Sequence, residues 1–127
     1  MAFKIPYVDF QQQYSSQREE ILDALDKVMA SGQYILGEEV QKFEKSFAEL
    51  CNTKFAIGVA NGTDALILSL KALGIGPGDE VITTPNSWIS SASCIGLIGA
   101  TPVFVDVRQD QNMNPHLLEQ AISSRTK

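Results

Sequence analysis

Residues 55–73 read FAIGVANGTDALILSLKAL, and the rest of the chain is organised around this stretch. Apolar residues alternate over residues 55–59, which predicts a short buried strand. Asn61 and Gly62 predict a tight turn, because both residue types tolerate positive φ. The run over residues 65–73 is apolar on nearly every side, which predicts a buried helix. The stretch therefore indicates a strand, a turn and a helix of an α/β protein.

The start of that helix is a candidate anion site. We expect Thr63 or Asp64 to cap it. The first N–H groups of a helix have no partner within it, and the helix dipole places positive charge there. The Thr63 hydroxyl would add one more donor. An ordinary strand-to-helix turn accounts for the same residues, so this stretch by itself leaves both interpretations open.

Length and composition favour one globular domain without a nucleic-acid or membrane role. The chain has 127 residues, 44% hydrophobic and 20% charged, with a net charge of −5. Its ten basic residues are scattered, whereas a nucleic-acid surface needs them clustered. No apolar run approaches a membrane span, and the N-terminus lacks a signal-peptide pattern, so we expect a cytoplasmic protein. Cys51 and Cys94 are expected to be buried free thiols, His116 to lie at the surface, and no residues are spaced as metal ligands.

The first part of the chain, residues 1–54, is predicted to hold an arm and two helices. The arm covers Met1–Gln13. The first helix runs from Ser16 to Ala30, since Ser16 and Glu19 form a capping box, and Gly32 closes it. The second helix runs from Glu38 to Cys51. The loop between them, GQYILG, carries Tyr34 and Ile35, which we expect to contact the domain, a second subunit or a ligand.

The second part, residues 55–127, is predicted to hold β/α units. After the central stretch, GIGPGDE at 74–80 is a turn and not a nucleotide fingerprint, because it follows a helix and precedes a strand. Strands are predicted over 81–84 and 102–107, a helix over 88–97, and a last helix capped by Asn114 with Pro115 at its first position. Residues 123–127 are expected to complete no further element. The order β-α-β-α-β-α predicts a mostly parallel sheet. Three strands are few, so the 127 residues are interpreted as one incomplete domain.

Several longer motifs support a family assignment. They are SGQYILGEEVQKFEKSFAEL at 31–50, ANGTDALILSLKALGIGPGDEVITTPNSW at 60–88 and GATPVFVDV at 99–107, with a weaker match at 112–127. With these motifs the chain resembles the N-terminal part of the DegT/DnrJ/EryC1/StrS family of pyridoxal-phosphate-dependent sugar aminotransferases. The resemblance implies an α/β fold, the N-terminal part of the large domain of the aspartate-aminotransferase-like fold type I. Two leading helices would precede its β-α-β-α-β-α part.

The resemblance assigns roles to four residues. Gly62 and Thr63 match the turn that binds the phosphate of pyridoxal 5′-phosphate (PLP). Trp88 matches the aromatic residue that stacks on the pyridine ring, although a tryptophan in the core would give the same sequence signal. Tyr34 matches a loop near the active site and the dimer interface, which implies that it borders the nucleotide-sugar substrate. Asp64 is expected to cap the helix, since its carboxylate would repel a phosphate.

The resemblance also implies that this chain has no catalytic residue of its own. The lysine that forms the Schiff base with PLP and the aspartate that pairs with the pyridine nitrogen lie downstream in the family. None of the seven lysines, Lys4, Lys27, Lys42, Lys45, Lys54, Lys71 and Lys127, matches the Schiff-base position. Asp106 matches an aspartate that ends an earlier strand, and its role is interpreted as structural. By itself the chain is expected to be inactive.

The reaction implied for the parent protein moves an amino group, from glutamate, onto a nucleotide-linked keto sugar, in a homodimer. Two alternatives stay open. Some relatives have histidine in place of the lysine and dehydrate the sugar, and a non-catalytic dimerising or regulatory module would share the same residues. An unrelated nucleotide-binding α/β domain ranks last, because it needs a glycine-rich phosphate loop that the chain lacks.

Overall fold

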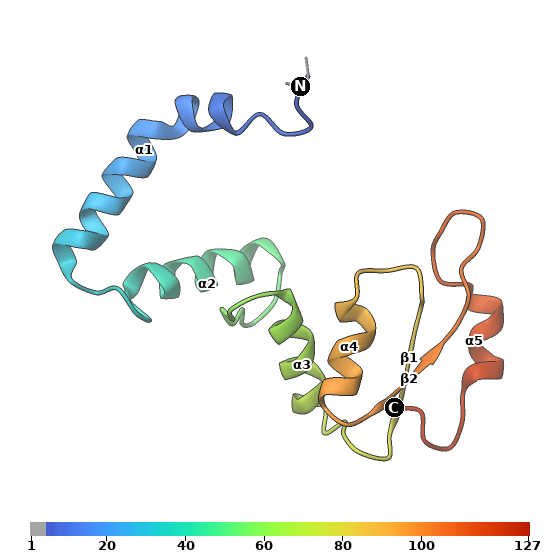
Figure 1. Ribbon diagram of the computed structural model, residues 1–127. Coiled ribbons are helices and arrows are strands. Elements are labelled where there is room, and N and C mark those ends of the chain that lie inside the picture. The colour runs from blue at the N-terminus through green and yellow to red at the C-terminus, as the bar shows by residue number, and fades with distance from the viewer. Residues whose placement is uncertain (1–4) are drawn as a thin grey trace. The chain divides into compact units, whose positions relative to one another are not determined.

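The computed structural model describes residues 5–127, which form two compact units that divide between Gly58 and Val59 (Figure 1). Within the described residues, no helix has both the length and the apolar character needed to cross a membrane.

The first unit contains α1 (Phe10–Ser31) and α2 (Glu38–Leu50). The predicted start of the first helix at Ser16 is wrong. Asp9 caps α1, since its Oδ1 accepts a hydrogen bond of 3.0 Å from the Gln12 N–H. The Ser16 hydroxyl instead donates to the carbonyl of Gln13 within the helix, at 2.9 Å. The expected arm is therefore helical from Phe10 onward, and its residues 1–4, with Lys4, lie outside the described residues.

The predicted end of α1 and the predicted span of the second helix are confirmed. Gly32 has a φ of 70° and closes α1 in the left-handed conformation. The second helix ends at Leu50 with Cys51 as its C-cap. Cys51 is exposed, so its predicted burial is wrong, while Cys94 is buried as expected. Within α2, Lys42 donates to Glu39 at 2.6 Å, and this hydrogen bond and the negative charge of Glu39 raise the pKa of Lys42.

Residues 55–59 do not form the predicted strand. A strand exists through hydrogen bonds to a neighbour, and the described part of the chain supplies no partner for this one. Phe55 and Ile57 are 71% and 81% exposed. The contact that holds the segment is local: the Gly58 N–H donates to Glu44 Oε1 on α2, at 2.6 Å. Apolar residues do alternate in this segment, but the segment becomes a buried strand only where a neighbouring element covers it.

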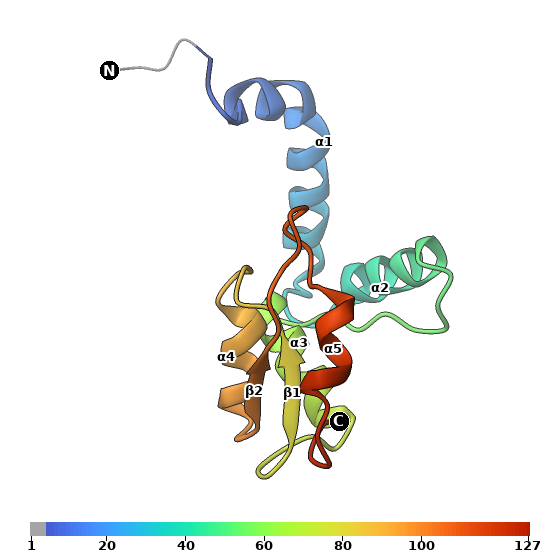
Figure 2. The same ribbon diagram turned by 90° about the vertical axis from the view of Figure 1, so that its right-hand side faces the viewer.

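The second unit contains α3 (Gly62–Ala72), β1 (Glu80–Thr83), α4 (Ser90–Leu97), β2 (Thr101–Phe104) and α5 (Pro115–Ala121). The two strands are parallel, as predicted, with Glu80 opposite Thr101 and Thr83 opposite Phe104. α3 and α4 lie on one side of the strands and α5 lies on the other (Figures 1 and 2). Asn114 caps α5 with Pro115 at its first position, also as predicted, and His116 is exposed.

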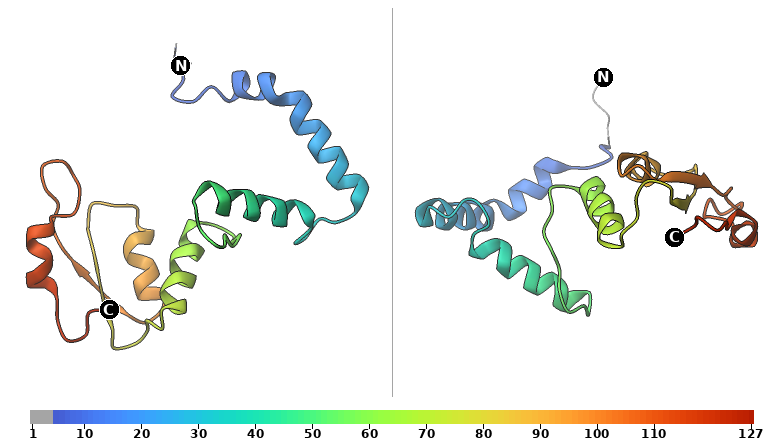
Figure 3. Two further views of the ribbon diagram at one scale, coloured as in Figure 1. Left: turned by 180° about the vertical axis from the view of Figure 1, so that it is seen from behind. Right: turned by 90° about the horizontal axis from the view of Figure 1, so that it is seen from below.

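The core of this unit forms where α4 packs against α3 and β1. Its buried residues are Cys94, Ile95, Ile98 and Ala100, with Ile67, Leu70, Ile75 and Val81 packed around them. The adjacent positions of α3 and α4 are also visible from behind (Figure 3). The predicted burial of α3 is wrong for this chain. None of its residues is buried, and Leu66 and Leu68 are 42% and 52% exposed.

The last residues of the chain do pair with the sheet, against expectation. The Glu80 N–H donates to the Arg125 carbonyl at 2.9 Å, and the Lys127 N–H donates to the Glu80 carbonyl at 3.0 Å. A parallel bridge joins Glu80 to Thr126. The buried Glu80 carboxylate accepts hydrogen bonds from the Ser123 hydroxyl and the Arg125 guanidinium. These side chains and backbone groups together fix the segment along the free edge of β1.

Candidate functional site

The first turn of α3 is built around Asn61. Asn61 is the N-cap: its Oδ1 accepts from the Asp64 N–H at 2.9 Å, and its Nδ2 donates to Asp64 Oδ2 at 3.0 Å. The expectation that Thr63 or Asp64 caps the helix is therefore wrong. Asn61 also has an extended backbone, with φ −165°, so the predicted positive-φ turn does not form. An Asn cap at this point replaces the turn, because the chain enters the helix directly from an extended residue.

Two backbone donors stay free at this helix end. Within the described residues, neither the Gly62 N–H nor the Thr63 N–H has an acceptor, whereas the next two N–H groups bind Asn61. A Cβ built on Gly62 would meet no atom within 4 Å, and Gly62 does not have positive φ. Neither backbone conformation nor packing within this chain requires glycine there. The space beside the two donors is open, as an approaching anion needs.

Thr63 is tied to the start of α4. Its Oγ1 lies 2.7 Å from the Ser90 Oγ, and either atom is geometrically able to donate. Ser90 is buried, with 7% of its surface exposed, while Thr63 is half-buried. The two helix starts are therefore joined by a pair of hydroxyl groups that lie 27 residues apart in the sequence.

Trp88 lies just before α4, in the segment that follows β1. The predicted helix start at Trp88 is two residues early, since α4 begins at Ser90, although the Trp88 carbonyl accepts the Ser91 N–H at 2.9 Å. Its side chain is 77% exposed. No core formed by the described residues therefore covers Trp88. A flat aromatic face remains open beside the segment that leads to Ser90.

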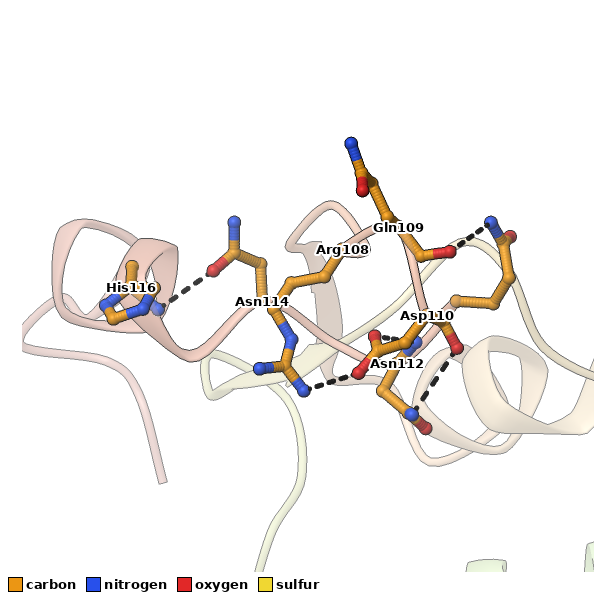
Figure 4. Close-up of polar contacts among 7 residues, drawn as sticks. Arg108, Gln109, Asp110, Asn112, Asn114 and His116 are labelled. Carbon is orange, nitrogen blue, oxygen red and sulfur yellow. Dashed lines mark hydrogen bonds and ion pairs between the residues drawn. The ribbon is translucent and has the colours of Figure 1, made fainter.

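A polar loop after β2 also contacts this segment. Residues 108–112 close on themselves, since Arg108 N–H donates to the Asn112 carbonyl at 2.8 Å and Arg108 pairs with Asp110 (Figure 4). Gln111 has a φ of 65°, and its Oε1 accepts a hydrogen bond of 3.0 Å from Asn86 Nδ2. Sequence reasoning missed both Asn86 and Gln111, since nothing in the local pattern joins residues 25 positions apart.

The remaining predicted residues are placed as follows. Asp106 has structural contacts: its Oδ1 accepts from the Val107 N–H at 2.7 Å, and its carbonyl from the Asn114 N–H at 2.9 Å. Tyr34 belongs to the first unit, is 61% exposed, and donates its hydroxyl to the Met29 carbonyl at 3.0 Å. A hollow of about 870 Å³ in that unit lies between α1 and α2, but none of the predicted site residues lines it. No group of acidic, Cys or His side chains within residues 5–127 is placed to hold a metal ion.

Comparison with known proteins gives consistent matches. A model of the DegT/DnrJ/EryC1/StrS aminotransferase family matches residues 15–127. The chain is 47% identical over 124 residues to a dTDP-3-amino-3,6-dideoxy-alpha-D-galactopyranose transaminase of Aneurinibacillus thermoaerophilus, covering 97% of this chain and 34% of that protein. The chain thus spans about a third of the length of the curated relatives it matches.

Solved structures match as well. The crystal structure of Streptomyces venezuelae DesV in complex with a ketimine intermediate superposes with a TM-score of 0.94 at 42% identity, covering 99% of this chain and 34% of that one. The Bacillus subtilis protein NtdA with bound cofactor PMP gives a TM-score of 0.91 at 31% identity, covering 100% of this chain and 30% of that one. These matches confirm the predicted fold class, that of fold type I PLP enzymes.

Proposed function

Because the chain belongs to the DegT/DnrJ/EryC1/StrS aminotransferase family, we propose that it forms the phosphate-binding part of a PLP-dependent sugar aminotransferase. The proposed reaction moves an amino group, from glutamate, onto a keto sugar linked to a nucleotide. The observation that carries this proposal is the start of α3. There, two free backbone N–H groups and a hydroxyl group lie beside a glycine with open space around it.

The donors at this helix end suit a phosphate group. The N–H groups of Gly62 and Thr63 and the Thr63 hydroxyl would donate to the phosphate oxygens, and the positive end of the helix dipole adds to the attraction. The Asp64 carboxylate does not occupy these donors, because it accepts from Asn61 Nδ2 instead. Three groups of one helix turn would thus hold the phosphate and fix the position of the cofactor.

Two further residues would orient the reactants. The exposed indole of Trp88 would stack on the pyridine ring and hold its plane, and such a contact excludes water from one face of the ring. Tyr34 would border the nucleotide sugar. When bound, the cofactor supplies an electron-accepting ring and carries the amino group between donor and acceptor.

We infer that the lysine which binds PLP covalently, and the aspartate against the pyridine nitrogen, come from outside these 127 residues. The placement of the two lysines of the second unit supports this. Lys71 lies in the last turn of α3, about 13 Å along the helix axis from Gly62. The Lys127 N–H pairs with Glu80 at the start of β1, whereas Trp88 and Ser90 follow the other end of that strand.

The proposed partners are a nucleotide-sugar substrate, an amino donor and a second copy of the protein, and the proposed location is the cytoplasm. Relatives bear names of transaminases that act on dTDP- and UDP-linked sugars, which supports the substrate class. A homodimer would let a second subunit complete each active site.

The test uses the intact protein as its own cell makes it, with PLP, isotope-labelled glutamate and a panel of nucleotide-linked keto sugars. We expect the labelled nitrogen in the sugar, detected by mass spectrometry. Loss of water from the sugar without gain of nitrogen would replace the aminotransferase by the dehydratase. The 127-residue chain by itself is the second sample, and it should give no aminated product. Turnover by that pure chain would contradict the inference about the lysine.

A further inference from the structure

We infer that Ser90 is a positioning residue: its hydroxyl donates to Thr63 Oγ1 and so directs the Thr63 proton toward the phosphate group. The inference rests on the proposed function of Thr63 and adds a residue that would not touch the cofactor. Its geometric basis is the 2.7 Å contact between the two hydroxyl oxygens, one at the start of α3 and one at the start of α4.

Burial decides the direction of this hydrogen bond. Each hydroxyl has one proton, and one of the two protons occupies the contact. Among the described residues, neither hydroxyl has a second hydrogen-bond partner. If Thr63 donated, the proton of Ser90 would be left without an acceptor in a site that is 7% exposed. A buried donor without a partner costs about 1–3 kcal/mol, so Ser90 donates and Thr63 accepts.

That direction leaves the Thr63 proton free on the more open side. Thr63 is half-buried, and its neighbour Gly62 has no atom within 4 Å of an added Cβ. A hydroxyl that accepts one hydrogen bond becomes a better donor for the next, because the two bonds polarise each other. Ser90 would therefore donate to Thr63 and Thr63 to the anion, and the free N–H groups of Gly62 and Thr63 would donate to the same anion.

The neighbouring serine offers a matched control. Ser91 follows Ser90 in the first turn of α4, but its Oγ lies 2.7 Å from Ser87 Oγ and has no contact with Thr63. A serine-to-alanine change there removes a hydroxyl pair of the same length from the same helix turn. The two changes differ in the residue that loses its hydrogen-bond partner: Ser87 in Ser91→Ala, and Thr63 in Ser90→Ala.

The experiment measures PLP binding by the intact protein and its variants, by absorbance titration, with phosphorus NMR of the bound cofactor. We expect Thr63→Val to weaken binding about ten- to a hundredfold, the size of a hydrogen bond to a charged group. Ser90→Ala should weaken it roughly two- to tenfold and shift the phosphorus resonance, whereas Ser91→Ala should do neither. In the Thr63→Val background, Ser90→Ala should cause no further loss.

The outcomes test two claims separately: that Thr63 binds the phosphate, and that Ser90 positions the Thr63 hydroxyl. If Thr63→Val leaves PLP binding unchanged, the proposed phosphate site is wrong. If Thr63→Val weakens binding but Ser90→Ala matches Ser91→Ala, the site stands and the role of Ser90 is wrong. Equal losses from Ser90→Ala in the wild-type and Thr63→Val backgrounds would also overturn it, because they would show that Ser90 does not act through Thr63. Should Ser90→Ala fail to fold, Ser90→Cys fills the site with a slightly larger side chain and a weaker donor, and should give a smaller loss in the same direction.

Discussion

Gly62→Ala should raise the stability of the protein without cofactor and weaken its affinity for PLP. Gly62 is the first residue of α3, lacks positive φ, and would have no neighbour within 4 Å of the new Cβ. Replacing glycine by alanine at such a position stabilises by about 0.4–1 kcal/mol, because the unfolded chain loses conformational freedom. For a domain of ordinary size this raises Tm by about 1–4 °C.

The loss of affinity comes from the same methyl group. If the phosphate approaches the free N–H of Gly62, the Cβ stands beside its path and removes or lengthens one charged hydrogen bond. That bond contributes about 1.5–3 kcal/mol, so binding should weaken about ten- to a hundredfold. Thermal unfolding of the cofactor-free protein and an absorbance titration with PLP measure the two effects separately.

Gly96→Ala is the matched control. Gly96 lies inside α4, also lacks positive φ, and has no atom within 4 Å of an added Cβ. It should stabilise the protein as Gly62→Ala does and leave PLP binding unchanged. Our reasoning is refuted if Gly62→Ala binds PLP as tightly as Gly96→Ala does, or if it destabilises the cofactor-free protein.

Four further outcomes are expected. Trp88→Ala should weaken PLP binding while changing the free energy of unfolding by less than about 0.5 kcal/mol, because the side chain is exposed, and Trp88→Phe should retain most of the affinity. Ile95→Ala should cost about 2–5 kcal/mol in denaturant unfolding, since Ile95 is 2% exposed at the centre of the core. Asn61→Ala should cost about 1 kcal/mol through loss of the helix cap, seen as faster amide exchange at Asp64. Arg125→Ala should speed amide exchange at position 80, because the buried Glu80 carboxylate loses its counterion. Adding Glu80→Gln should partly reverse this, because a neutral amide needs no counterion. Unchanged exchange in Arg125→Ala, or no reversal in the double variant, would contradict the assigned contact.

The elements that the sequence predicts well are those whose signals are local. The helix over 38–50 begins after a glycine and carries acidic residues in its first turn, and α5 has an Asn cap followed by proline. The two parallel strands follow from their place between helices. In each case the residues that decide the structure lie within a few positions of one another, so the periodicity and the caps are sufficient.

The wrong predictions have one physical cause: the structure of each segment depends on contacts with residues that are distant in the sequence. Residues 55–59 have the composition of a strand, but a strand needs a neighbour. The helix over 62–72 is apolar on several sides, yet none of its residues is fully buried, because only one of its faces packs against the described residues. The pairing of residues 125–127 with Glu80 was missed for the same reason, since it joins positions 45 residues apart.

In the candidate site, too, local sequence signals were predicted and contacts between distant residues were not. The anion site at the start of the helix was predicted because a helix start creates donors by its own geometry, and the family resemblance assigned Gly62 and Thr63 to it. Ser90 was not predicted, because the sequence pattern gave only a helix over 88–97. Its contact with Thr63 depends on how α3 and α4 pack, and that packing is set by core residues such as Ile67 and Ile95.

Three features around Thr63 are unfavourable for this chain by itself, and one ligand would explain all of them. Among the described residues, two helix N–H groups have no acceptor, a glycine stands where neither φ nor packing requires it, and the tryptophan side chain is 77% exposed. Sequences that fold well avoid such choices, so their concentration in two neighbouring helix starts supports the proposed site. A phosphate would bind the donors and use the space beside the glycine, and an aromatic ring joined to that phosphate would cover the indole. A free phosphate ion would account for the first two features and leave the third unexplained. The combination therefore favours a ligand with both parts, as PLP has.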